Sequence, residues 1–339
     1  MTKPFALSIL DLAPIAEGTS TPDALAETVK LAQLGDALGY TRLWYAEHHG
    51  MASIASSSPE VLIASAAAHT QNIRVGSGGV MLLNHAPLRI AEAFRTLEAL
   101  HPGRVDLGLG RAPGGDGYAM RALRSGGGEE FSAYLAEMMA FDEDSFPPDH
   151  PFSRVPVAPG GINLPPLWLL GSSGASAQAA GQLGMGYAFA AHFSHTPPGP
   201  AFEAYRYGFK PSAAMPEPRT ILGVSVVCAP TDEEAQYLSH SQAVQWALFT
   251  TGEQRRLMSP EAAHARVLTT QQQGIIDHQS TLWIVGSPQT VRDTIAEKLE
   301  SSGADEVIIT TTIHSYELRR RSYQLLAEAF GLTPRALAA

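Results

Sequence analysis

Residues 42–50, RLWYAEHHG, combine a short apolar run with an abrupt polar end. Residues 43–46 predict a short buried strand, and the final glycine predicts the turn that ends it. Glu47, His48 and His49 stand between them, and burying such groups is costly unless they find partners or a ligand. Because side chains alternate along a strand, we expect Glu47 and His49 on one side of it and His48 on the other.

The same unit, a short apolar stretch beside a helical one, repeats along the chain. Strands are expected at 5–10, 43–46, 73–83, 104–110, 166–170, 187–193, 221–229 and 306–311. Helices are expected at 21–39, 59–69, 87–100, 175–183, 202–209, 232–248, 287–301 and 318–330. Alternating strands and helices indicate a parallel sheet covered by helices. Eight such units predict an α/β fold, the (β/α)8 TIM barrel with insertions, and a doubly wound open sheet is the alternative.

Two segments fall outside this alternation. Residues 112–160 are rich in glycine and proline around a helix at 130–140, and residues 250–280 are polar and helical. No change of composition separates either segment from its neighbours. The sequence therefore predicts a single domain over 1–339, with 112–160 and 250–280 as insertion segments that shape a substrate pocket.

Composition restricts the class of protein. Apolar residues make up 45% and charged residues 17% of the 339 residues, which is typical of a globular chain. The net charge is −10 and no basic run is present, which argues against nucleic acid or an anionic membrane as a partner. The single Cys228 excludes an intramolecular disulfide, and no long apolar stretch predicts a signal peptide or membrane span. We therefore expect a cytoplasmic protein.

In a TIM barrel, the active site lies at the carboxyl ends of the strands. The residues expected there are polar or small: Asp11, Glu47, His48, His49, Gly78, Gly79, Arg111, Ser172, Ser173, His192 and His314. Strand-end histidines and acids can bind a metal, but the chain lacks an H-x-H pair after its first strand and lacks HExxH. We expect no metal site. The sequence assigns no role to His192 or His314.

Residues 76–79, GSGG, place three glycines inside a predicted strand. Glycine weakens a strand, so its presence indicates either a bulge or close approach of a ligand to bare backbone. A planar ligand lying on this backbone is the functional interpretation. A non-proline cis peptide bond is a further expectation at this point.

Arg111 and the turn GSSG at 171–174 follow two neighbouring predicted strands. Pro113 rules out a dinucleotide fingerprint after Arg111, because no helix can open there. Free amides at a helix N-terminus bind phosphate, and an arginine beside them strengthens such a site. Ordinary N-capping by Ser173 is the alternative interpretation of the serine turn.

Four stretches together resemble the bacterial luciferase-like flavin monooxygenase family. They are LWYAEHH, VGSGGVMLLNHAPLRIAE, LEALHPGRVDLGLGRAPGG and LGSSGASAQAAGQLGMGYAFA, at 43–49, 75–92, 97–115 and 170–190. The resemblance runs in order from Phe5 to about Phe193 and resumes near residue 283. Luciferases proper have a cysteine where this chain has Gly110, so light emission and an aldehyde substrate are not expected.

The resemblance implies a barrel that binds reduced FMN, supplied by a separate NAD(P)H-dependent flavin reductase. Oxygen would add to the flavin as a C4a-peroxyflavin, which oxygenates a small organic substrate. The family's motifs imply His48 as the catalytic histidine, with Glu47 beside it as a second catalytic residue. The alternation of side chains assigns His49 a structural role. They imply contacts to the flavin ring from Gly78, Gly79 and Leu170, and to its phosphate from Arg111, Ser172, Ser173 and Ser176.

The resemblance also implies a homodimer. Two other activities remain open on the same barrel. One is hydride transfer without oxygen by a flavin- or deazaflavin-dependent oxidoreductase. The other is a non-catalytic flavoprotein subunit resembling the luciferase β chain.

Overall fold

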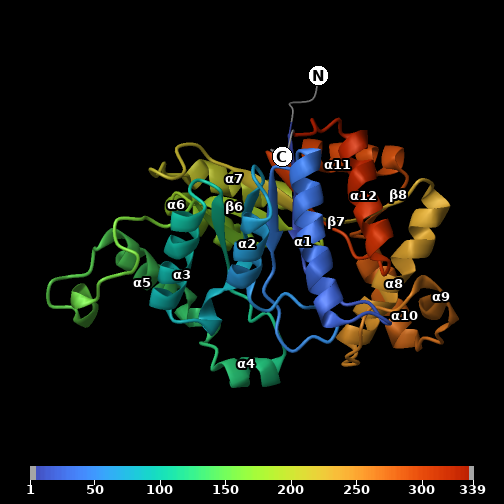
Figure 1. Cartoon of the computed structure of the whole chain (residues 1–339), viewed down its shortest axis with the longest axis horizontal. Helices are drawn as coiled ribbons and strands as arrows, with labels where there is room; N and C mark the ends of the chain where they lie inside the picture. Colours follow the sequence, from blue (N-terminus) through green and yellow to red (C-terminus); the bar gives the residue numbers. More distant parts are fainter. Residues whose placement is uncertain (1–4, 336–339) are drawn as a thin grey trace.

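A closed barrel of parallel strands forms the centre of the computed structural model, which describes residues 5–335 (Figure 1). Its strands are β1 (Ala6–Asp11), β2 (Arg42–Tyr45), β3 (Arg74–Met81), β4 (Val105–Gly110), β5 (Leu167–Gly171), β6 (Gly186–Ala190), β7 (Thr220–Cys228) and β9 (Glu306–Thr310). Strands β1 to β6 pair in chain order, β9 lies between β1 and β7, and β6 pairs with β7 to close the ring. The predicted TIM barrel is confirmed.

Eight long helices cover the outside of the barrel (Figure 1). They are α1 (Thr21–Leu38), α2 (Pro59–Ala68), α3 (Pro87–Leu100), α6 (Gly174–Gln182), α7 (Pro198–Gly208), α8 (Asp232–Thr250), α11 (Pro288–Ser302) and α12 (Tyr316–Ala329). Each corresponds to a predicted helix. The order Thr21-Pro22 predicts Thr21 as the cap of this first helix. That prediction is wrong by one residue, because Ser20 and not Thr21 accepts the hydrogen bond from the Asp23 amide.

The two segments outside the alternation form small helices of their own. The first contains α4 (Gly117–Leu123) and α5 (Phe131–Glu143), with short 3₁₀ turns η2 (Gly128–Glu130) and η3 (Pro151–Arg154). The second contains α9 (Pro260–Ala265) and α10 (Thr270–Ser280). An unexpected strand, β8 (Ile284–Gly286), pairs with β7 outside the barrel ring. No helix in the described part of the chain is long and apolar enough to cross a membrane.

Apolar side chains fill both faces of the barrel wall. One cluster lies between the strands and the helices, and a second occupies the barrel interior. The interior cluster consists of Leu10, Trp44, Ala46, Trp168, Ala188, Met215, Ile221 and Ile308. Its two tryptophans meet edge to face, with ring centroids 5.4 Å apart. The interior is therefore a packed core and not a pore.

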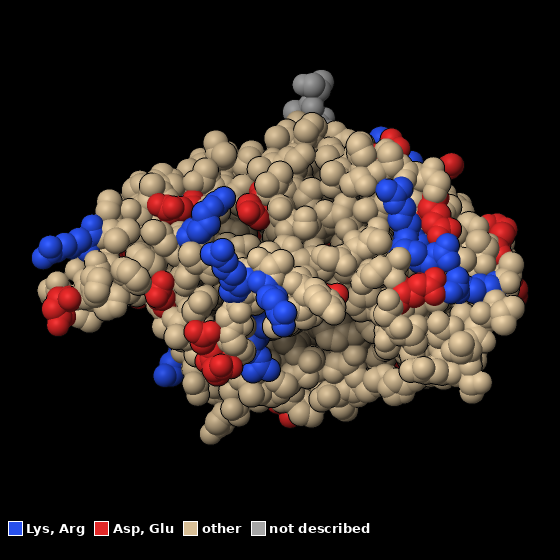
Figure 2. Space-filling model, turned by 90° about the horizontal axis from the view of Figure 1, so that it is seen from below, with Lys and Arg blue, Asp and Glu red and all other residues tan. Residues whose placement is uncertain are grey.

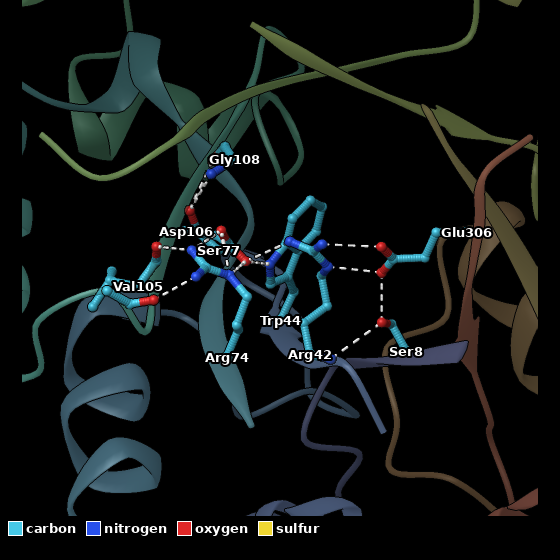
Figure 3. A network of polar contacts seen from close by, with 10 residues as sticks. Ser8, Arg42, Trp44, Arg74, Ser77, Val105, Asp106, Gly108 and Glu306 are labelled. Atoms are coloured by element: carbon cyan, nitrogen blue, oxygen red, sulfur yellow. Dashed lines mark hydrogen bonds and ion pairs between the residues drawn. The ribbon is translucent and has the colours of Figure 1, made fainter. Parts of the chain in front are cut away.

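A buried network of charges ties the amino-terminal ends of the strands together (Figure 3). Arg42 of β2 donates to Glu306 of β9 and to Asp106 of β4, both at 2.7 Å. The Trp44 indole and Arg74 of β3 also donate to Asp106. Burial opposes ionisation of Asp106, but Arg42 and Arg74 outweigh it and lower the pKa of this carboxyl. Charged residues at this end of a barrel serve stability rather than catalysis.

Candidate active site

The opposite end of the barrel carries the candidate site. Side chains alternate along a strand, so every second residue after an interior side chain also faces the inside of the barrel. This applies to the carboxyl ends of β2, β5 and β6. The interior residue of β2 is Trp44 and that of β5 is Trp168. Two positions further along these strands stand Ala46 and Leu170, and four positions further stand His48 and Ser172. Figure 2 views the face on which α4 lies and shows it hollowed, with Lys and Arg side chains beside the hollow.

Glu47 lies on the other side of this strand end and is completely buried. Its Oε1 accepts hydrogen bonds from Nε2 of His49 at 2.7 Å and Nε2 of His85 at 2.9 Å. Asn84 donates to the same oxygen at 3.3 Å, and the Met81 amide donates to Oε2 at 2.9 Å. The expected common side of Glu47 and His49 is confirmed.

These contacts determine the charge of the cluster. Burial alone would raise the pKa of Glu47, but the hydrogen bonds and charge of His85 and the other donors lower it. Burial likewise disfavours the charged form of His85, yet the Glu47 carboxylate raises the pKa of that imidazole. Sequence reasoning missed Asn84 and His85, although both follow the third strand and satisfy the same strand-end criterion.

His48 has a different environment. Its backbone amide donates to the Ser56 carbonyl at 2.9 Å, while its buried Nδ1 has no hydrogen-bond partner among the described residues. Burial lowers the pKa of His48 to about 4; the nearby Glu47 opposes this shift and His49 adds to it. The imidazole is therefore neutral at pH 7 and can accept or donate a hydrogen bond.

The glycines of β3 form the expected irregularity. The bond between Gly78 and Gly79 is cis. The pairing of β3 with β4 also shifts register between Ser77 and Val80, so the strand is irregular at these glycines. Space explains the residue type as well: a Cβ on Gly79 would lie 2.7 Å from the Gly108 carbonyl oxygen. Glycine is thus required here by packing, whether or not a ligand approaches.

Arg111 and the serine turn follow β4 and β5, which are neighbours in the barrel. Arg111 is exposed, and no described residue pairs with its guanidinium. Ser173 occupies the N-cap position of α6 but caps no backbone amide with its side chain. The Ser176 hydroxyl donates to the Ser173 carbonyl at 2.9 Å and lies 3.1 Å from the Tyr187 hydroxyl. The amides that open α6 therefore remain available to an anion.

Two other strand-end residues have protein partners. Asp11 accepts a hydrogen bond from Arg319 of α12 at 2.8 Å and one from Thr28 of α1 at 2.8 Å. His314 lies 3.1 Å from the Glu17 carbonyl oxygen. Among residues 5–335, no three His, Cys, Asp or Glu side chains lie so that they could hold a metal ion.

Comparison with known proteins assigns the family. Residues 5–306 match the model of the family described as luciferase-like monooxygenase. The chain belongs to this family. It is 40% identical over 326 residues to a luciferase-like monooxygenase of Escherichia coli strain K12, covering 95% of this chain and 96% of the relative. It is 34% identical to the N-acetyl-S-alkylcysteine monooxygenase of Bacillus subtilis, covering 95% and 97%.

A solved structure of the same fold is that of apo-MsnO8. It is 39% identical to this chain, with a TM-score of 0.85, and the match covers 98% of this chain and 99% of the other. Every strand-end residue from Asp11 to His192 lies inside the part that matches the luciferase-like monooxygenase family. The barrel mouth described above is therefore within the family's shared region.

Proposed function

We propose that this protein is an FMN-dependent monooxygenase. It takes reduced FMN from a separate NAD(P)H-dependent flavin reductase and uses O2 to oxygenate a small organic substrate. Membership of the luciferase-like monooxygenase family supports the reaction class. The proposal includes a homodimer and a cytoplasmic location. A single buried cysteine, Cys228, suits the reducing conditions of the cytoplasm.

One observation supports the cofactor above the others. An unpaired arginine and an uncapped helix N-terminus follow two adjacent strands. Arg111 with Ser172, Ser173 and Ser176 would hold a phosphate group, because guanidinium, hydroxyl and amide donors all suit its oxygens.

The remaining residues suit a flavin ring and its chemistry. Gly78, Gly79 and Leu170 would contact the ring. Leu170 packs against the barrel interior, and a Cβ on Gly78 would meet Leu10 and Trp44 of the same interior. Bound reduced FMN supplies the electrons that activate O2. His48, neutral and without a partner for Nδ1, would exchange a proton with the bound molecules. Glu47 is enclosed by donors, so its role would be to hold His49 and the loop after β3 in position.

The substrate class is open to direct search. The Bacillus relative is named for an N-acetylated S-alkylcysteine, which makes thioethers a reasonable first group to screen. Aldehydes, ketones and sulfonates complete the screen. A compound that is oxygenated should accelerate O2 consumption when FMN and a flavin reductase with NADH are supplied. Product formation with no O2 uptake beyond that of the reductase and FMN alone would instead identify hydride transfer, and binding of FMN without any turnover would indicate a non-catalytic subunit.

The phosphate site has its own test. Arg111→Ala should weaken binding of FMN by roughly tenfold or more, the loss of a charge-assisted hydrogen bond, while changing riboflavin binding little. Fluorescence titration with both flavins measures this difference. Arg124→Ala is a matched control, because that arginine also follows β4 but lies beyond α4. Equal losses for FMN and riboflavin would contradict the phosphate assignment.

A further inference from the structure

Helix α8 brings a polar side chain to the mouth of the barrel. The inner side of β7 begins with Ile221 of the interior cluster, and alternation continues it through Gly223 to Ser225. A Cβ on Gly223 would come within 3.1 Å of Nδ1 of His192, which follows β6, so this side of β7 borders the mouth. Nε2 of Gln242 in α8 donates to the Ser225 hydroxyl at 2.9 Å. Gln242 therefore reaches the inner side of the strand.

The carbonyl end of this side chain has no partner. Gln242 is only 9% exposed, and its buried Oε1 accepts no hydrogen bond from any residue in 5–335. The buried Ser225 hydroxyl holds the other end of the amide in place. A buried carbonyl oxygen without a donor is costly, so its position points to a ligand that supplies one.

Gln245 repeats this arrangement one turn further along α8. Its Nε2 donates to the Arg255 carbonyl at 3.1 Å, and its Oε1 is also buried without a partner in the described part of the chain. The Arg255 carbonyl can only accept, so the amide must be turned with its oxygen away from it. Residues three apart on a helix are neighbours on one face. Two carbonyl oxygens that lack donors therefore lie on the same side of α8.

The chain after α8 places Gln245 at the same end of the barrel. Arg255 donates to Glu17, in the loop after β1, at 2.9 Å, and Leu257 forms a β-bridge with the same loop. Figure 1 shows α10, which follows this segment, in the lower half of the view together with α4. Gln242 and Gln245 thus stand beside the mouth, on the side of the β7 end and the loop after β1.

Charge decides which kind of donor suits these oxygens. Both glutamines are neutral, and Arg255 and Glu17 in the segment that Gln245 contacts pair with each other at 2.6 Å. A carboxylate would be repelled by carbonyl oxygens. An ammonium group would give up its hydration beside an acid that is already paired. A neutral N–H or O–H group meets neither obstacle.

We propose that Gln242 and Gln245 recognise a neutral hydrogen-bond donor, an amide N–H or an alcohol O–H, on the molecule that enters the barrel mouth. Gln242 accepts from that donor, Ser225 positions the Gln242 amide, and Gln245 offers a second acceptor beside it. As a statement about the substrate, this site rests on the proposed function. Binding of a donor at the mouth itself requires no cofactor.

Two small amides test the site on the cofactor-free protein. N-methylacetamide carries an N–H donor, and N,N-dimethylacetamide keeps the carbonyl without it. NMR of the isotope-labelled glutamine side chains follows binding, and the signal lost in Gln242→Met identifies that residue. The Gln242 signal should shift saturably, and N-methylacetamide should bind roughly threefold to tenfold more tightly, as expected for one hydrogen bond. Equal binding of the two amides, or no saturable shift, would overturn the proposal.

Variants of α8 show whether the preference comes from Gln242. Gln242→Met keeps the length of the side chain and removes its carbonyl, so the preference measured through the Gln245 signal should disappear. Gln242→Leu replaces that variant if it does not fold. Gln236→Met is the matched control, because Gln236 is an exposed glutamine of the same helix, and it should leave the preference unchanged. A preference that survives in Gln242→Met would contradict the assignment.

Turnover gives a second measurement once a substrate is known. For a substrate that carries the donor, Gln242→Met should raise KM roughly threefold to tenfold and leave kcat and FMN affinity near their native values. A loss of kcat with unchanged KM would rule out a role in recognising the substrate. If FMN does not bind to the native protein, the proposed function fails, while the two amides still report on the donor site.

Discussion

At the scale of single residues, the hydrogen bond between His85 and Glu47 predicts how the stability of the fold depends on pH. His85 donates to a fully buried carboxylate, and its side chain is only 23% exposed. Its pKa is raised in the folded protein, so the stabilisation it contributes is fully present below pH 6.5, its ordinary value, and is lost as the pH rises through the folded pKa. His85→Gln should therefore lower the free energy of unfolding by about 1–2 kcal/mol at pH 6 and by less at pH 9.

Urea unfolding at pH 6, 7.5 and 9 measures this difference. Asn84→Ala is the matched control, because Asn84 donates to the same Glu47 oxygen but does not titrate in this range. The effect of Asn84→Ala should be the same at each pH. A His85→Gln effect that is equally constant would show that the histidine stabilises the fold without carrying charge.

At the scale of helices and strands, periodicity predicted the elements but not their ends or partners. The eight barrel strands are short apolar stretches that alternate with longer helical ones, so a single sequence reveals them. Strand β8 is three residues long and pairs on one side only, so it has no period to detect. The partner of Asp11 lies 308 residues away in α12, and no local pattern announces Arg319. The positions of candidate site residues were predictable from strand ends, whereas the hydrogen bonds of Glu47 required the fold.

The cap of α1 allows a test of an N-cap that the sequence placed one residue too late. Ser20 accepts from the Asp23 amide, and Asp23 accepts in return from the Ser20 amide. Ser20→Ala should cost about 1 kcal/mol of unfolding free energy, typical of a lost N-cap, and Thr21→Ala only a few tenths. Urea unfolding at pH 7 compares the two variants. A larger loss in Thr21→Ala would restore the capping threonine expected from sequence.

At the scale of the whole molecule, the two ends of the barrel have separate tasks. The amino end holds the network around Asp106, which is 1% exposed and bound by Arg42 and Arg74. The carboxyl end holds the unpaired donors and imidazoles. The network joins strands far apart in sequence, since Arg42 and Glu306 are 264 positions apart. It therefore contributes to closing the ring, and a change in it should affect stability without affecting the site.

Asp106→Asn should lower the free energy of unfolding by about 3–5 kcal/mol, because it leaves arginine charge buried without its partner. The folded protein lowers the pKa of Asp106 below its ordinary value of 3.8. The stabilisation from this carboxylate is therefore fully present above pH 3.8 and is lost as the pH falls through the lower, folded pKa. Native and variant stabilities should thus converge in acid.

Arg321→Ala is the control, because it breaks an ion pair with the 63% exposed Glu328. It should cost no more than about 1 kcal/mol of unfolding free energy. In folded Asp106→Asn protein, FMN affinity should be unchanged; loss of FMN binding in protein that remains folded would show that the two ends depend on each other.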